Sequence, residues 1–223
     1  MPVLYVLRVF CDNEGQFGSP LGVVLDGPAI PPERRQPLAA ELGFSETAYV
    51  DDLDTGQLRI LTPAAELPFA GHPLVGTAWL LSRHLGSPVM NPPAGPVPTW
   101  TSNDQVWIRA PLAAAPFWRL NQVADAAAVD AMTEPPHPDQ DADQFWAWID
   151  QQAGTVRARV FAARYGVPQD EACGSASMLL AAQLGRAITI QHGRGSLVQA
   201  SPAPNGMADL GGRVVWDHER AVD

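Results

Sequence analysis

The chain has 223 residues, a net charge of −10 and a pI near 4.8. A chain of this length holds one large domain or two of about 100 residues, with a core that needs no metal or disulfide staple. All 14 basic residues are arginine, which excludes chemistry that needs lysine, such as Schiff-base formation or a Walker A loop. No basic run exceeds Arg34-Arg35, so a nucleic-acid-binding pattern is absent and we expect a small-molecule partner.

The cysteines and the apolar runs bear on metal or redox sites, on membrane spans and on the compartment of the protein. Cys11 and Cys173 stand far apart with no C-x-x-C spacing, so neither a zinc ribbon nor a thioredoxin-type site is offered. No apolar run approaches the ~20 residues of a membrane span, and the N-terminus lacks the charged region and cleavage site of a signal peptide. We therefore expect a cytoplasmic protein that contacts neither nucleic acid nor membrane.

The first half of the chain predicts strands alternating with two helices. Apolar, β-branched runs bounded by turn residues predict strands at 3–10, 21–25, 44–50 and 58–61. A short helix through Leu38–Leu42 is expected to end at Gly43, because glycine accepts positive φ. A longer helix is expected from Pro73, which suits the first helical position, to Gly86.

The pattern then starts again after a Pro-rich segment. We place a domain junction near residue 103, which divides the chain into domains 1–103 and 104–223. The second half predicts strands at 106–111 and 156–163, a helix ending at Gly185 and a hairpin series over 188–216.

Two segments of the second half are harder to assign. Residues 121–143 are acidic and Ala-rich, which predicts a surface loop or a partly helical excursion in which Asp139, Asp141 and Asp143 are solvated. Residues 145–152, FWAWIDQQ, predict a helix that docks its Trp residues against the core.

The two halves repeat one pattern of strand, polar loop and buried helix. Each loop ends at a helix N-terminus of small residues, Gly71-His72-Pro73 in the first half and Cys173-Gly174-Ser175 in the second. Free N–H groups and the helix dipole there can hold a carboxylate or an enolate. The alternative is that the glycines only let helix and strand pack closely. Two facing termini would make an anion site in a chain without lysine.

Three titratable side chains lie beside these turns. Glu46, at the start of an apolar strand, is either a surface residue or a general base whose pKa is raised by partial burial. His72 either returns a proton or orients an oxyanion, or it simply forms hydrogen bonds at the helix start. Asp170 precedes the second glycine turn and is either a capping residue or an acid directed into the same cleft.

These segments resemble the phenazine-biosynthesis PhzF-like family, whose fold is similar to that of diaminopimelate epimerase. The resemblance is carried by FGSPLGVVL, GFSETAYV, LRILTPAAELPFAGHPLVGTAWLL and DEACGSASMLLAAQLGR, and it is weak between 112 and 155. Its most specific part is the order of S-E-T followed by TPAAELPFAGHP.

The resemblance implies an α+β fold of two pseudo-repeated domains, each a curved, mostly antiparallel sheet around a central helix. It also implies a homodimeric, cofactor-independent isomerase without a metal, which moves a proton on a small carboxylic acid in the cleft between the domains. By position, Glu46, His72 and Asp170 match the catalytic residues. The matched substrate contacts are Ser45, Gly71, Gly174 and Ser175.

Two departures from the family pattern bear on the substrate. Ser19 stands where the family has asparagine, and Cys173 stands where threonine is usual; both are candidate substrate-binding residues. Cys173 is either a reactive thiol at a helix N-terminus or a small buried residue in the threonine position. Arg194, in a turn between two strands, could reach a substrate carboxylate.

Three functions are compatible with these residues. The leading hypothesis is a PhzF-like isomerase that transfers a proton through Glu46. The second is a racemase or epimerase that uses Glu46 and Cys173 on opposite faces of the substrate. The third is a non-catalytic scaffold that binds a metabolite or a protein partner. Substitution of Cys173 separates the first two, and substitution of Glu46 tests the third.

Overall fold

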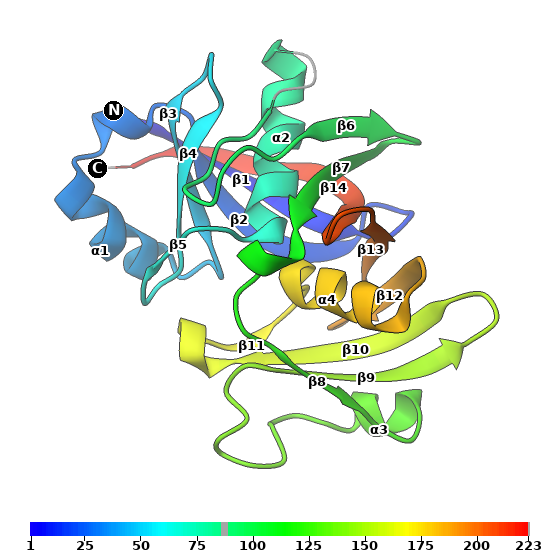
Figure 1. Cartoon of the computed structure of the whole chain (residues 1–223). Helices are drawn as coiled ribbons and strands as arrows, with labels where there is room; N and C mark the ends of the chain where they lie inside the picture. The colour runs from blue at the N-terminus through cyan, green and yellow to red at the C-terminus, as the bar shows by residue number, and fades with distance from the viewer. Residues whose placement is uncertain (86–88, 223) are drawn as a thin grey trace.

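The computed structural model describes residues 1–85 and 89–222, and within them fourteen strands form a curved, mostly antiparallel sheet around two helices (Figure 1). The upper lobe contains β1 (Val3–Cys11), β2 (Phe17–Val24), α1 (Pro32–Leu42), β3 (Thr47–Asp52), β4 (Gln57–Leu61), β5 (Glu66–Leu67), α2 (Gly71–Leu85), β6 (Thr99–Ser102) and β7 (Gln105–Pro111). The lower lobe contains β8 (Arg119–Gln122), α3 (Ala126–Asp130), β9 (Asp143–Asp150), β10 (Thr155–Ala162), β11 (Val167–Asp170), α4 (Gly174–Leu184) and β12 (Ile188–His192). The remaining strands, β13 (Ser196–Ala203) and β14 (Met207–Ala221), connect the lobes.

Each lobe is built around one helix. The upper helix, α2, packs against β1, β2, β7 and β14, and its Leu74, Val75 and Leu81 are completely buried. The lower helix, α4, packs against β13 and β14, with Met178 and Leu180 completely buried. A helix that is apolar on nearly every side is expected at the centre of a core. The predicted fold class is therefore confirmed.

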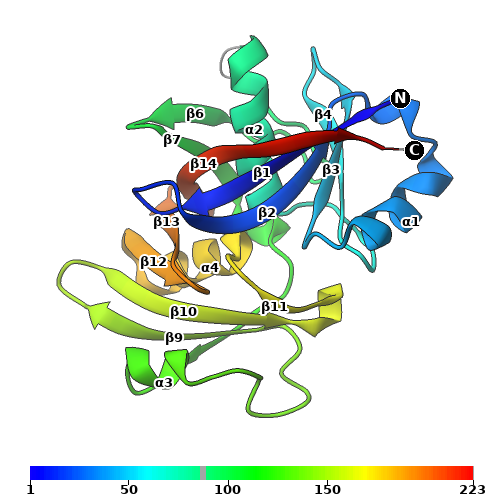
Figure 2. The same cartoon turned by 180° about the vertical axis from the view of Figure 1, so that it is seen from behind.

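The last strand joins the two lobes. Residues 207–212 of β14 pair with β13 and β7, whereas residues 213–221 pair antiparallel with β1. The chain consequently ends beside its own first strand, as the red and blue strands of Figure 2 show. The C-terminal residues thus complete the sheet of the upper lobe. The division into two domains at residue 103 stays a prediction.

Glycines mark the ends of α1 and α4 as expected, but α1 begins at Pro32, six residues before the expected start at Leu38. Gly43 follows α1 with φ of 70°, as expected of a glycine that ends a helix. The second helix begins at Gly71, two residues before the expected start at Pro73, and Gly86, its expected end, lies outside the described residues. Within 1–85 and 89–222, no helix is both long enough and apolar enough to cross a membrane.

The predicted helix at 145–152 is wrong, because residues 145–150 belong to strand β9 and residues 151–152 to the turn that follows it. Their aromatic and branched side chains favour a strand, and β9 pairs antiparallel with β10, placing Trp146 opposite Ala158. The strand is buried on both faces at Phe145, Trp146 and Ala147, so the polar–apolar alternation that marks a strand is missing.

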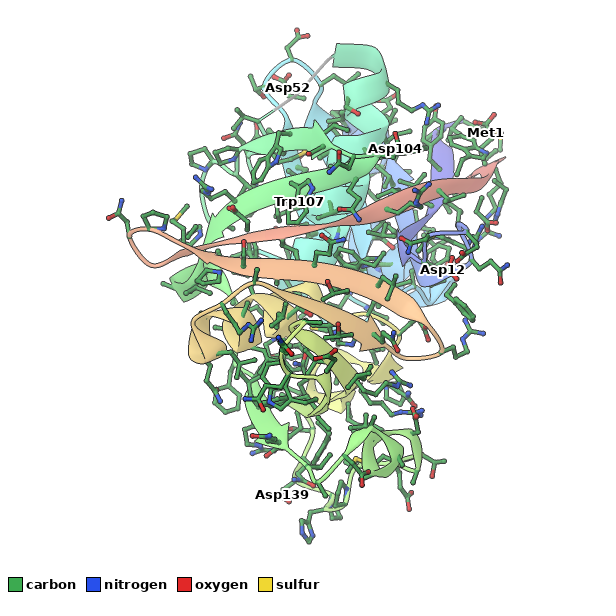
Figure 3. The ribbon with its side chains drawn as sticks, turned by 90° about the vertical axis from the view of Figure 1, so that its right-hand side faces the viewer. Met1, Asp12, Asp52, Asp104, Trp107 and Asp139 are labelled. Atoms are coloured by element: carbon green, nitrogen blue, oxygen red, sulfur yellow. The ribbon has the colours of Figure 1, made fainter. Side chains whose placement is uncertain are left out.

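The acidic segment is only partly solvated. Asp139 lies at the far end of the lower lobe, as labelled in Figure 3. Asp143, by contrast, is completely buried and accepts hydrogen bonds from Arg119 and Asn121. The expectation that Asp143 is solvated is therefore wrong, because this carboxylate and its arginine tie the start of β9 to β8.

Candidate active site

The candidate site lies where the N-termini of α2 and α4 meet. A Cβ atom built on Gly174 would lie 3.1 Å from the backbone nitrogen of His72 and 3.3 Å from the carbonyl carbon of Gly71. The two backbones approach this closely because both helices begin with glycine. The first N–H groups of a helix have no partner within it, so both termini offer donors and the positive end of a dipole to one place.

A small cavity of about 20 Å³ adjoins these termini and is lined from both lobes. Eight of the nine predicted site residues line it: Ser45, Glu46, Gly71, His72, Asp170, Cys173, Gly174 and Ser175. The ninth, Ser19, does not line it, although its backbone carbonyl contacts His72. Residues predicted from separate halves of the sequence are thus brought together.

Glu46 and His72 form an ion pair in which the imidazole is buried and the carboxylate side chain is 14% exposed. His72 Nδ1 lies 3.0 Å from Glu46 Oε2, and His72 Nε2 lies 3.2 Å from the carbonyl oxygen of Ser19. A carbonyl only accepts, so Nε2 carries a proton. Burial opposes both charges, but the hydrogen bond and charge of His72 outweigh it and lower the pKa of Glu46. Burial likewise opposes the imidazolium, yet the bond to Glu46 and the nearby carboxylates raise the pKa of His72.

Asp170 is the carboxyl group with the raised pKa. It is 7% exposed at the end of β11, and burial, followed by the negative charge of Glu46, raises its pKa to about 7. The expectation that burial raises the pKa of Glu46 is therefore wrong, because His72 reverses the shift. Two carboxyl groups whose pKa values are driven apart can act as a base and an acid at the same pH.

Cys173 is a protonated thiol at neutral pH. Burial, together with the charge of Asp170, raises its pKa well above the ordinary value. Its Sγ lies 3.6 Å from the hydroxyl oxygen of Ser175, and its side chain is buried. Although it precedes a helix N-terminus, the dipole does not overcome burial beside a carboxylate, and Cys173 is poorly suited to act as a base.

Two hydroxyl groups complete the polar wall of the cavity. Ser45 Oγ is buried beside Glu46, and it contributes to the lowered pKa of that carboxyl group. Ser175 Oγ accepts a hydrogen bond of 2.9 Å from the indole nitrogen of Trp118. Both hydroxyl groups belong to residues that line the cavity, where a bound ligand can contact them.

Part of the cavity lining is aromatic and was not predicted. The rings of Trp118 and Tyr165 lie 5.2 Å apart at the cavity, beside Leu67 and Val167. Trp118 lies where the family resemblance is weak, and no motif surrounds it. Arg194 does not line the cavity, because its 77% exposed side chain lies 3.4 Å from Glu171.

Metal ligands are not grouped at the site or elsewhere in the two described ranges. No cluster of three or more His, Cys, Asp or Glu side chains there could hold a metal ion.

A curved, mostly antiparallel sheet around two central helices is the fold that this chain shares with a phenazine biosynthesis PhzC/PhzF protein and with a proline racemase. The chain belongs to the phenazine biosynthesis-like (PhzC-PhzF) protein family, whose model matches residues 7–141. It is 30% identical to a trans-2,3-dihydro-3-hydroxyanthranilate isomerase of Pseudomonas fluorescens, over 79% of this chain and 78% of the relative. It is 31% identical to the Pseudomonas aeruginosa isomerase of that name, over 85% and 82% of the two chains.

Solved structures show the same fold at lower sequence identity. A putative phenazine biosynthesis PhzC/PhzF protein of Clostridium difficile superposes with a TM-score of 0.78 at 17% identity, covering 100% of both chains. A probable proline racemase of Agrobacterium radiobacter superposes with a TM-score of 0.67 at 14% identity, covering 100% of this chain and 93% of the racemase.

Proposed function

We propose that this isomerase moves a proton along a small unsaturated carboxylic acid by general acid–base catalysis, without a cofactor, between the lobes, which must part to admit the acid because the cavity of about 20 Å³ holds about one water. The observation that carries the proposal is the ionised Glu46, paired with His72 and adjacent to the titratable Asp170, beside two facing helix N-termini. Each element of such a reaction is present: a base, an acid and a site for a delocalised anion.

Glu46 begins the reaction by removing a proton from a carbon next to the unsaturated system. The N–H groups at the starts of α2 and α4 hold the carboxylate and the delocalised anion. Glu46 itself, or Asp170 beside His72, then returns the proton to another carbon. His72 keeps Glu46 charged and oriented, because its Nδ1 holds Oε2 while its Nε2 is fixed by Ser19. A homodimer, implied by the resemblance, stays a prediction.

The substrate we propose is of the class of trans-2,3-dihydro-3-hydroxyanthranilate, the compound in the names of the Pseudomonas relatives. The test incubates this compound with the protein in deuterated water and follows the isomer and its label by NMR. We expect turnover with deuterium at the newly protonated carbon. If turnover and label incorporation both stay at the protein-free rate, this substrate assignment is refuted.

The rate is expected to fall on the alkaline side of neutrality. The pKa of Asp170 is about 7, so the fraction of protonated Asp170 decreases about tenfold from pH 6 to pH 8. An acid that must be protonated therefore gives a kcat that falls by about the same factor. Glu46 stays charged at mildly acidic pH because its pKa is lowered, so no matching loss is expected near pH 6.

The measurement is a pH–rate profile of the wild type and of Asp170→Asn. The residual activity of the variant should lack the step near pH 7, because an amide does not titrate there. If both proteins lose activity near pH 7 in the same way, the group that titrates there is not Asp170.

Cys173→Ser is expected to lower kcat/KM by less than about fivefold. The thiol is protonated and buried, so neither half of the proposed proton transfer depends on it. A racemase that used Glu46 and Cys173 on opposite faces would instead lose at least about a hundredfold, since one of its two proton-transfer groups would be gone. Steady-state kinetics on the dihydro acid separate the two mechanisms.

A further inference from the structure

The turn between β12 and β13 connects the lower lobe to β2 of the upper lobe. Ser196, completely buried at the start of β13, donates a hydrogen bond of 2.8 Å to Glu171 Oε1. The backbone N–H of Gly18 in turn donates a bond of 3.0 Å to Ser196 Oγ. A serine hydroxyl has one proton to donate and can accept at the same time, so Ser196 bridges the lobes with both capacities used.

This bridge continues to the candidate active site. Ser19, the residue after Gly18, offers the carbonyl oxygen that holds His72 Nε2 at 3.2 Å. His72 then holds Glu46 through Nδ1 at 3.0 Å. One chain of contacts thus runs from Glu171, next to Asp170 in the lower lobe, through Ser196 and the backbone of β2, to the proposed base in the upper lobe.

The backbone at the bridge adopts conformations that need such support. Phe17 and Gly18 have φ values of 57° and 83°, and positive φ is unfavourable for Phe17. A Cβ on Gly195 would lie 2.7 Å from the ring of Phe17, and one on Gly193 would collide with the Glu171 carboxylate. The sequence predicts no more than a turn for Gly-Arg-Gly-Ser. Its two glycines leave the space that the Phe17 ring and the Glu171 carboxylate occupy.

We propose that Ser196, held by Glu171, is a positioning residue for His72. It fixes the Phe17–Gly18 peptide, and so the backbone that leads into Ser19, so that the Ser19 carbonyl keeps the proton on Nε2 and directs Nδ1 at Glu46. The charged groups that face His72 are Glu46 and Asp170, and neither contacts Ser196. The effect on activity rests on the proposed function of His72, whereas the effect on the His72 ring does not.

Two variants test this proposal by separate routes. Ser196→Ala removes the bridging hydroxyl, and Glu171→Ala removes its acceptor from a partly exposed position. Thr77→Val is the matched control, because Thr77 Oγ1 is buried in α2 and has no hydrogen-bond partner in the described part of the chain. Long-range ¹H–¹⁵N spectra report the protonation of both His72 nitrogens across pH, and kinetics on trans-2,3-dihydro-3-hydroxyanthranilate give kcat and KM.

Both test variants are expected to shift the Nε2 signal of His72 and its titration midpoint. They should also lower kcat about tenfold with less than a twofold change in KM, and Thr77→Val should change neither. His72 signals that match the wild type in both test variants would overturn the proposal, whatever the kinetics. Shifted His72 signals with unchanged kcat would support the positioning role and refute the proposed role of His72 in the reaction, which keeps the two failures distinct.

Discussion

Glu46→Gln is expected to lower kcat for isomerisation by about 10³-fold and to abolish deuterium incorporation from solvent. The substitution keeps the size and most hydrogen-bonding capacity of the side chain, but an amide oxygen is far too weak a base to take a proton from carbon. His72 also loses the negative partner that raises its pKa, so its pKa should fall toward the ordinary value. Both effects remove the charged pair on which the proposed reaction depends.

Glu41→Gln is the matched control for this variant. Glu41 lies in α1 on the surface of the same lobe, where its carboxylate pairs with Arg34. We expect its kcat to equal that of the wild type, because an exposed pair contributes little and lies away from the cavity.

The same pair of variants tests whether the protein is a non-catalytic scaffold. A scaffold would bind the dihydro acid equally well with Gln at position 46 and would exchange no proton in either form. Isothermal titration and label incorporation, measured on the two variants and the wild type, give the answer. Wild-type turnover by Glu46→Gln would show that another group is the base.

The parts of the site that were predicted are those set by local backbone geometry. The glycines at 71 and 174 mark helix starts, and a repeated pattern in the two halves indicated that these starts are equivalent positions. Glu46 and Asp170 each lie within a few residues of a recognisable turn. Short-range sequence signals therefore place these groups beside the turns, whereas the family resemblance implies their catalytic roles, and their protonation states depend on contacts between distant segments.

The features of the site that were not predicted depend on contacts between residues far apart in the sequence. Trp118 reaches the cavity because β8 pairs parallel with β9, and neither strand has an alternating pattern. Ser196 and Glu171 meet across 25 residues through a turn whose shape is set by two glycines. The lowered pKa of Glu46 arises from His72, 26 residues away, which no local signal indicates.

Gly174→Val is expected to lower kcat/KM by about a hundredfold and the free energy of unfolding by about 1–3 kcal/mol. Its Cβ would lie 2.7 Å from Leu210 Cδ2, in addition to the close approaches to His72 and Gly71, so the start of α4 must move away from the start of α2. Both sets of N–H donors would then be displaced from the anion. One well-placed donor lowers the activation free energy by about 3 kcal/mol. Gly174→Ala should show the same changes at smaller size.

Gly185→Ala separates this geometric effect from a general loss of stability. Gly185 follows the other end of the same helix with φ of 65°, and a Cβ there meets nothing within 4 Å. The alanine should lower the free energy of unfolding by about 1 kcal/mol through backbone strain and leave kcat/KM unchanged. Thermal unfolding and kinetics on the three variants decide the matter: wild-type kcat/KM in Gly174→Val would mean that the meeting of the two helix termini serves packing alone.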